Sequence, residues 1–174
     1  MAMNSNSLNI LFDDEIWEEK IPEVELWANK VFATALDFLS VNDLGFEGWN
    51  NKPVSIALSL SSNDEVQKLN REFRAKDKPT NVLSFANIDD EAFEDEFLNE
   101  DVVDLGNIIM ALETLEDEAA IKKISLKNHF AHLLVHGVLH LFGYDHIEDD
   151  EADEMEGIEV DILKELNIAN PYEE

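Results

Sequence analysis

The sequence predicts a protein of the α+β class, with a small mixed sheet of four strands flanked by helices. Short apolar segments of strand length are separated by longer segments that carry apolar residues at helical spacing. The last third of the chain has only the helical pattern. Apolar residues make up 45% of the 174 residues, enough for a buried core, and no repeat or linker interrupts them. We therefore expect a single domain over residues 1–174.

Four segments have the length and composition of strands. They are Leu8–Phe12, Val54–Leu60, Asn81–Phe85 and Leu105–Ala111. In the second segment, every other residue is a large apolar one, which predicts a strand with one buried face. The fourth segment is almost wholly apolar, and this predicts a central position in the sheet.

Two helices are predicted in the first half of the chain. Glu23–Leu39 carries apolar residues at helical spacing, and Pro22 lies near its start, where proline is tolerated. Asn63 or Asp64 is expected to cap a second helix that ends near Phe73.

The C-terminal third is predicted to form three helices. The first is Glu113–Ile124. Ser125 is expected to cap a strongly apolar helix, Leu126–Phe142, which Gly143 would end in a left-handed conformation. The last helix, Asp149–Leu166, begins with acidic residues that suit the helix dipole, and its apolar residues form one face.

The segment Ile88–Asp104 is dominated by Asp and Glu. So many like charges repel one another, which predicts an exposed, mobile loop. A calcium-binding loop is disfavoured, because the regular alternation and the glycine of an EF-hand are missing.

Charge and composition limit the classes of function. The net charge of −28 excludes nucleic-acid binding by bulk electrostatics, so contact with RNA requires a local basic patch or a metal ion. The chain has no cysteine, which excludes disulfides and thiolate metal sites. Met1–Leu8 has neither a basic start nor an apolar run, and no segment approaches the ~18 apolar residues of a membrane span. We expect a cytoplasmic protein with no membrane association.

The strongest motif begins at His136 and reads HGVLHLFGYDH. His136 and His140 are four residues apart, so both rings lie on one face of a helix. Gly143 permits a sharp reversal, after which His146 can return to the same point. A lone histidine on an apolar helix is usually a packed core residue, but three at ligand spacing predict one metal site. The spacing is that of the metal ligands in metzincin proteases.

Three neutral imidazoles leave one coordination position open, which is typical of catalytic zinc and favours hydrolysis. Zinc is the expected ion, although imidazole also suits other divalent transition metals. Proteases of this pattern place a glutamate directly after the first histidine, and here that position is Gly137, which argues against proteolysis. His132 is predicted to be structural or to support the site, and His129 to be a surface or packing residue.

A second motif, LNREFRAKDKPTNVLSF, starts at Leu69 and is the densest basic segment of this acidic chain. Its basic residues are Arg71, Arg74, Lys76 and Lys78. The planar guanidinium of arginine suits phosphate oxygens. Composition alone equally allows a solvated basic turn that offsets acidic neighbours.

Together with LGNIIM (Leu105–Met110) and the segment HGVLHLFGYDHIEDDEADEM, these motifs closely resemble the YbeY family of bacterial endoribonucleases. The closing NPYEE (Asn170–Glu174) is a weaker match. The resemblance implies a zincin-like fold and a zinc-dependent endoribonuclease that prefers single strands. It also implies a role in 3′-end maturation of 16S ribosomal RNA of the small subunit and in ribosome quality control. The family's metal ligands map onto His136, His140 and His146, and its functional arginine onto Arg74.

The chain departs from the family pattern at three positions. Asn107 replaces the usual Asp, and an amide cannot act as a general base if that residue orients water or RNA. Phe73 stands where Tyr is common and Ala86 where Pro is common, and both are expected to be tolerated packing changes.

Two routes of cleavage and two rival functions stay open. Either metal hydroxide or the ribose 2′-hydroxyl attacks the phosphodiester, while Arg74 stabilises charge on the phosphoryl oxygens. One rival is a zinc peptidase or amidase. The other is a non-catalytic zinc-binding ribosome-assembly factor, whose acidic surface suits ribosomal proteins as partners. DNA is not an expected partner.

Overall fold

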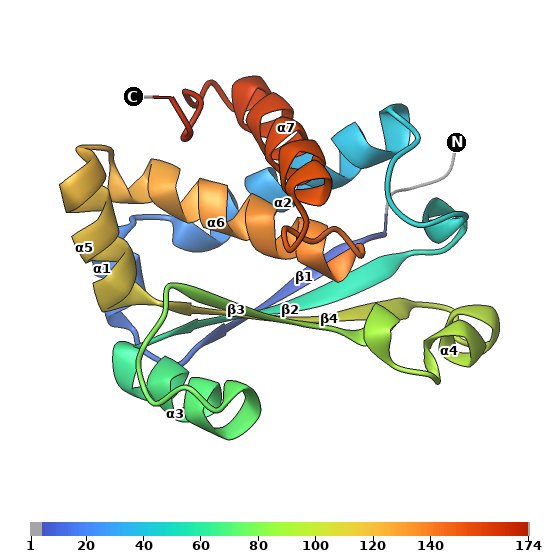
Figure 1. Cartoon of the computed structure of the whole chain (residues 1–174), viewed down its shortest axis with the longest axis horizontal. Coiled ribbons are helices and arrows are strands. Elements are labelled where there is room, and N and C mark those ends of the chain that lie inside the picture. The colour runs from blue at the N-terminus through green and yellow to red at the C-terminus, as the bar shows by residue number, and fades with distance from the viewer. Residues whose placement is uncertain (1–4, 174) are drawn as a thin grey trace.

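Figure 1 shows the computed structural model of the chain, which describes residues 5–173. The predictions for Met1–Leu8, Asn170–Glu174 and the whole range 1–174 extend partly to residues 1–4 and 174, which lie outside the described residues. Four strands form one sheet in the order β1-β2-β4-β3. The strands are β1 (Ser7–Phe12), β2 (Val54–Ser61), β3 (Val82–Ala86) and β4 (Val103–Ala111).

The sheet is mixed, as the sequence predicted. β1 pairs with β2 and β2 with β4 in parallel, whereas β3 pairs with β4 in the antiparallel direction. The apolar strand β4 lies in the interior of the sheet, which confirms its predicted central position. β3 lies at an edge, so one side of its backbone faces away from the sheet.

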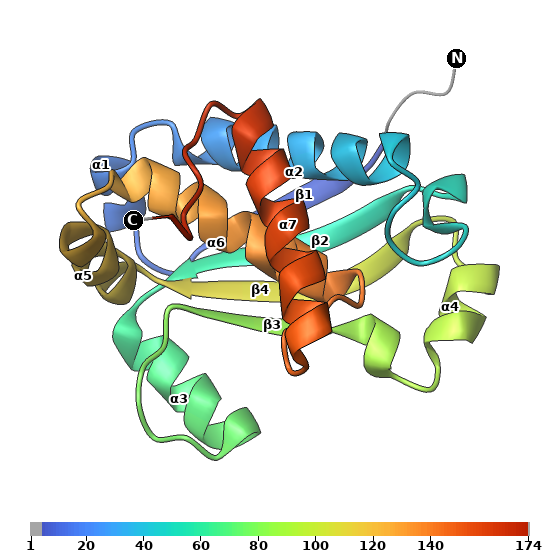
Figure 2. The same cartoon turned by 45° about the horizontal axis from the view of Figure 1, so that its top comes forward.

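Helices cover the two faces of the sheet unequally. In Figures 1 and 2, α6 lies along one face with α2 beside it, α7 crosses over them, and α3 lies on the opposite face. The helices are α1 (Ile16–Lys20), α2 (Val24–Val41), α3 (Asn63–Arg74), α4 (Phe93–Asn99), α5 (Leu112–Lys122), α6 (Leu126–Leu141) and α7 (Asp149–Glu165), with 3₁₀ turns at Trp49–Asn51 and Asn87–Asp89. The five predicted helices are present within two residues of their expected ends. The sequence pattern predicted neither α1 nor α4.

The main core lies between the sheet and the helices α2, α6 and α7. The predicted inner face of β2 is fully buried there and consists of Val54, Ile56, Leu58 and Leu60. A second, smaller cluster under α3 contains Val66, Leu83 and Ala111. Because both of its faces are buried, the sheet is held between two layers of helices. It therefore provides a rigid support for α6 and for the side chains that α6 carries.

The predicted cap of α3 is wrong by one or two positions. Ser62 has the extended conformation of a cap, and its hydroxyl accepts a hydrogen bond from the Glu65 N–H at 3.4 Å. The side-chain Oδ1 of Asn63 instead accepts from the Thr114 hydroxyl at 2.7 Å, which links α3 to α5.

The acidic segment Ile88–Asp104 contains α4, so the prediction of a loop without regular structure is wrong for residues 93–99. Phe93 is buried, and the rings of Phe93 and Phe97 contact Phe46 edge to face, with centroids 5.6 and 5.7 Å apart. The Lys52 ammonium donates to three backbone carbonyls at the C-terminal end of α4. One apolar pair four residues apart thus holds a helix against the core despite its charge.

No helix within residues 5–173 is long and apolar enough to cross a membrane.

Candidate metal centre

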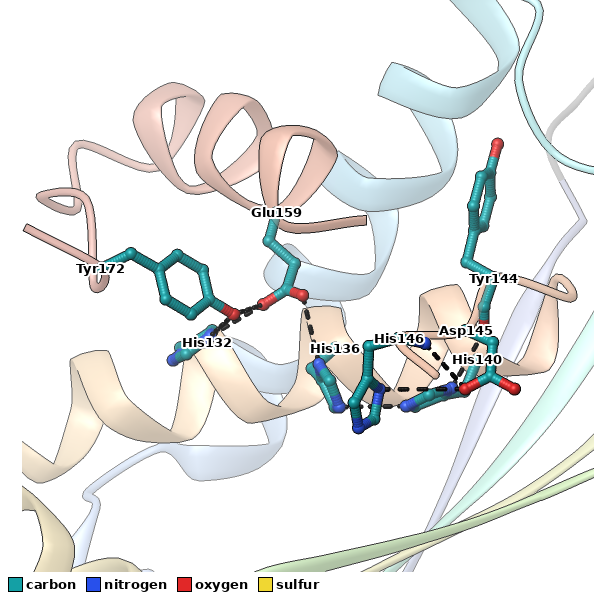
Figure 3. Close-up of polar contacts among 8 residues, drawn as sticks. All are labelled: His132, His136, His140, Tyr144, Asp145, His146, Glu159 and Tyr172. Carbon is teal, nitrogen blue, oxygen red and sulfur yellow. Dashed lines mark hydrogen bonds and ion pairs between the residues drawn. The ribbon is translucent and has the colours of Figure 1, made fainter. Parts of the chain in front are cut away.

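Helix α6 and the turn after it position the three histidines. The Ser125 hydroxyl caps α6 by accepting from the Asn128 N–H at 3.1 Å, as predicted. Gly143 has the predicted left-handed conformation, with φ of +98°. His136 and His140 lie on one face of α6, and the reversed chain carries His146 back over them (Figure 3).

The three rings converge on one point. The Nε2 atoms of His136 and His140 are 3.0 Å apart, and the His146 ring centroid lies 5.4 and 5.1 Å from theirs. One ring nitrogen from each histidine lies within 4.8 Å of the other two. Ligands about 2.05 Å from a tetrahedral ion lie roughly 3.3 Å from one another. The group therefore has the dimensions of a site that could hold a metal ion.

Hydrogen bonds fix the tautomers of two rings. His136 Nδ1 lies 3.1 Å from the Glu159 carboxylate, and His140 Nδ1 lies 2.9 Å from the Tyr144 carbonyl oxygen. Because an ionised carboxylate and a carbonyl only accept, each Nδ1 carries the proton and each Nε2 a lone pair. Two lone pairs 3.0 Å apart repel each other, and a cation between them removes that repulsion. The donor set thus fits a metal ion.

Burial supports the neutral form of His140. It lowers the pKa of His140, and the positive charge that His136 can carry lowers it further. A neutral imidazole is the form that binds metal.

Glu159 on α7 is a fully buried carboxylate beside this group. It accepts from His136 Nδ1, from His132 Nε2 at 2.8 Å and from the Tyr172 hydroxyl at 2.7 Å (Figure 3). Burial alone would raise the pKa of Glu159. The hydrogen bonds from His132 and His136, the charge of His136 and the Tyr172 hydroxyl nevertheless lower it to about 2. Glu159 is therefore ionised, and His132 has the supporting role predicted for it.

The histidines line a hollow of about 940 Å³ that extends to the edge of β3 and to α5. Its basic residues are Arg74, Lys76, Lys78 and Lys122, and its acidic residues are Asp89 and Asp145. In the whole chain, 40 acidic residues outnumber 12 basic ones. Along the lining of this hollow, basic residues outnumber acidic ones instead. A local basic patch of this kind is what contact with a polyanion requires.

Arg74 lies in the same hollow as the histidines. One of its N–H groups donates to the Ser84 carbonyl on β3 at 2.9 Å, and its guanidinium lies 5.3 Å from the ring centre of Phe85. These two contacts hold the guanidinium against the outer edge of the sheet. The structure therefore brings the four residues singled out in the sequence, Arg74, His136, His140 and His146, to one hollow.

Asn107, one of the three departures from the family pattern, lies outside the hollow. An added Cβ at Gly137 of α6 would lie 3.0 Å from the Ile108 side chain, so Ile108 faces α6. Successive side chains of a strand point to opposite faces, which places exposed Asn107 on the other face of β4. It does not line the hollow. The same contact bears on Gly137, because any larger residue there would require the Ile108 side chain to move.

His129 is buried, so the surface alternative for it is wrong and the packing alternative is right. Its Nε2 lies 2.8 Å from the Glu118 carboxylate, which also accepts from the Asn81 amide. Burial lowers the pKa of His129, against the opposing effect of Glu118.

Glu159 and Tyr172 were not identified as site residues from the sequence. A signal for Glu159 was present, because it lies four residues after Met155 and three before Ile162, within the apolar stripe of α7. A charged residue in such a stripe needs a buried partner. The sequence signal for Tyr172 was its place in the closing NPYEE segment, the weaker part of the family resemblance.

Comparisons with known proteins give one consistent family. The family model described as Endoribonuclease YbeY matches residues 12–167. The chain is 41% identical to Endoribonuclease YbeY of Francisella philomiragia, over 98% of this chain and 97% of the relative. It is 42% identical to the protein of that name from Paramagnetospirillum magneticum, over 91% and 90%.

A protein of Thermotoga maritima with a known solution structure has a similar fold. The TM-score is 0.55 and the identity 22%, and the match covers 92% of each chain.

Proposed function

The chain belongs to the Endoribonuclease YbeY family, and from that premise we propose that it is a metal-dependent endoribonuclease that cleaves single-stranded RNA. The supporting observation is the shared hollow, because three converging imidazoles and an anchored arginine line one basic concavity of a very acidic protein. We place this activity in the cytoplasm, in maturation of the 3′ end of 16S ribosomal RNA and in ribosome quality control, carried by one domain over residues 1–174.

His136, His140 and His146 would hold one zinc ion, the first two through Nε2. When bound there, zinc supplies a Lewis acid that polarises a phosphate oxygen or lowers the pKa of water to about 7. The Nδ1 hydrogen bonds keep both imidazoles in the ligand tautomer.

Arg74 would bind the scissile phosphate. Within residues 5–173, its only hydrogen bond is the one to the Ser84 carbonyl, which leaves its other N–H groups available for phosphoryl oxygens. Lys76, Lys78 and Lys122 line the same hollow and would bind the neighbouring phosphates. Because the Phe85 ring supports the guanidinium, the donors are oriented before RNA arrives.

The test is cleavage of a labelled single-stranded RNA by the wild type, by the wild type with chelator, and by His140→Ala and Arg74→Glu. We expect loss of cleavage in all three, by about 10²- to 10³-fold for Arg74→Glu. Arg71→Glu is the matched control, because Arg71 lies on the same helix, pairs with Asp77 and does not line the hollow. Full activity of Arg74→Glu would remove this arginine from the mechanism.

The ends of the products separate the two routes of attack. A cyclic phosphate identifies the ribose 2′-hydroxyl as the nucleophile, and a linear phosphate with no cyclic precursor identifies water or hydroxide. Cleavage of a DNA strand of the same sequence would exclude the 2′-hydroxyl.

The net charge of −28 favours one second candidate, a zinc-binding ribosome-assembly factor that contacts basic ribosomal proteins. Intact RNA after incubation with fully metal-loaded wild type would favour it over the ribonuclease. The peptidase alternative has no support, because Gly137 leaves no carboxylate next to His136 and packs against Ile108.

A further inference from the structure

Glu159 is the only acidic side chain that is fully buried among residues 5–173, in a chain with 40 acidic residues. A buried carboxylate is costly to desolvate unless donors compensate it. Removing the charge and filling the position with an apolar residue would be the simpler way to stabilise a core. Its presence within the apolar stripe of α7 therefore calls for a reason beyond packing.

Both oxygens of Glu159 have partners, and the partners come from two parts of the chain. Oε2 accepts from His136 Nδ1 at 3.1 Å, whereas Oε1 accepts from His132 Nε2 and from the Tyr172 hydroxyl at 2.8 and 2.7 Å. His132 and His136 are one turn apart on α6, and Tyr172 lies near the C-terminus. The carboxylate thus joins α6, α7 and the C-terminal segment at one point (Figure 3).

The contact with His136 has a direct consequence for its ring. Because Glu159 can only accept, the proton of His136 stays on Nδ1 and the lone pair stays on Nε2, which points at His140. Rotation of the ring would break the hydrogen bond to Glu159. The carboxylate therefore sets both the tautomer and the direction of this imidazole.

The charge of Glu159 complements a metal ion. Three neutral imidazoles bring no negative charge to a divalent cation. Near the rings, Asp145 is half exposed and its carboxylate is 3.9 Å from His146 Nδ1, so solvent screens it. Glu159 is unscreened and one hydrogen bond away from a ligand. Its charge therefore acts on His136 with less screening than that of an exposed carboxylate.

We propose that Glu159 is a positioning residue of the metal centre, which orients His136 and offsets part of the positive charge of the ion, and that Tyr172 completes this contact from the C-terminal segment. The inference rests on the proposed function. Tyr172 adds a donor to Oε1, and its ring lies edge-on to His132 with centroids 5.4 Å apart. These contacts link the conformation of the C-terminal segment to the metal centre.

The test measures metal affinity rather than cleavage. Purified full-length wild type, Glu159→Gln, Tyr172→Phe and Asp161→Asn are titrated with zinc in competition with a chromophoric chelator. We expect an affinity about 10- to 100-fold weaker for Glu159→Gln and a smaller loss for Tyr172→Phe. Asp161→Asn removes the same charge from an exposed position two residues along α7, and should leave the affinity unchanged.

A second readout separates orientation from simple destabilisation. The absorption spectrum of the cobalt(II) form reports the geometry of the ligands, and we expect it to change in Glu159→Gln at full loading. Thermal unfolding of each metal-free variant checks that it is folded. If Glu159→Gln does not fold, the zinc affinity and cobalt spectrum of Tyr172→Phe become the test of the contact. This substitution removes only a hydroxyl from a half-exposed ring, so it opens no cavity in the core.

The outcomes distinguish this inference from the proposed function. Wild-type affinity and an unchanged cobalt spectrum in folded Glu159→Gln, or in folded Tyr172→Phe if it carries the test, would overturn the role of Glu159 and leave the metal site standing. A wild type that binds neither zinc nor cobalt would overturn the metal site itself, and the inference with it.

Discussion

The position of single protons decides what the three histidines can do. Glu159 and the Tyr144 carbonyl hold the protons of His136 and His140 on Nδ1, and the two free Nε2 atoms then face each other. The Tyr144 carbonyl belongs to the ligand motif itself, whereas Glu159 comes from a different helix, α7. The motif would thus supply three ligands and the acceptor that orients His140, whereas the acceptor that orients His136 depends on the packing of α7 against α6.

A residue-scale prediction concerns His129. Because its pKa is lowered by burial in the folded state, the unfolded chain binds more protons below the ordinary value of 6.5. His129 therefore does not reduce the free energy of unfolding above pH 6.5. As the pH decreases from 6.5 toward the lowered pKa, His129 reduces that free energy by at most about 1.4 kcal/mol per pH unit. Urea unfolding of metal-free protein at several pH values measures this slope. His129→Gln should reduce it, and an unchanged slope would contradict the assignment.

The sequence predicted part of the site at this scale. Spacing along a helix and across the turn that follows it is a local property, so His136, His140 and His146 could be predicted as one group without a structure. Arg74 lies in a basic segment with three other cations, and it was the family resemblance that singled it out among them. Glu159 and Tyr172 reach the site from α7 and the C-terminal segment, and such contacts depend on packing between elements that the sequence does not specify.

Among the elements, the contact between β3 and β4 determines where Arg74 is held. Gly106 on β4 has φ of +131°, and an added Cβ would lie 2.0 Å from the Phe85 carbonyl oxygen on β3. Gly106→Ala should therefore destabilise the protein by roughly 3 kcal/mol or more. At Gly157 in α7 nothing lies within 4 Å of an added Cβ, so Gly157→Ala should stabilise it by about 1 kcal/mol. Denaturant unfolding measures both, and equal effects would refute this account of the strand pair.

A second prediction at this scale concerns α4. Lys52 donates to three carbonyls at its C-terminal end, and no other lysine has this role among residues 5–173. Lys52→Met should leave these carbonyls without their donor and loosen α4, at a cost of about 1–3 kcal/mol. Hydrogen exchange followed by mass spectrometry should show faster exchange confined to this segment. Lys68→Met, at an exposed position on α3, is the control, and equal protection of α4 in both variants would contradict the prediction.

The helices α1 and α4 were not predicted, because neither has a clear periodic pattern of apolar residues in the sequence. In α4 the charged residues hide the apolar pair Phe93 and Phe97, whose partner Phe46 is distant in sequence. In α1, five residues are too few for a periodic pattern, and the helix depends on buried Trp17, whose indole donates to the Ser61 carbonyl. Both helices are stabilised by distant contacts rather than by their own propensity.

For the whole molecule, the main physical fact is the net charge of −28. Self-repulsion on this scale destabilises the compact state, and salt screens it over a Debye length of about 10 Å at 0.1 M. We expect the melting temperature of the metal-free protein to rise as sodium chloride is added from low ionic strength. Choline chloride should give the same rise if screening is the cause. A melting temperature that is constant or falls with salt would contradict this prediction.

At this scale the sequence predicted the fold class and the four mixed strands, but not the hollow. The hollow forms because β3 is at the edge of the sheet, where the segment after α3 meets the histidine face of α6. Strand order is set by long-range pairing, for which a single sequence offers no local signal. The gathering of Arg74, Lys76, Lys78 and Lys122 beside the histidines is therefore a result of topology.

The most direct test of the central claim is the rate of single-stranded RNA cleavage as a function of bound metal. Metal-free wild type is titrated with zinc while bound zinc and cleavage rate are measured in the same samples. The account predicts no cleavage without metal, a rate that rises in proportion to bound zinc, and saturation at one ion per chain, with no activity in His140→Ala. Full cleavage by the metal-free protein, or intact RNA at full zinc occupancy, would contradict it.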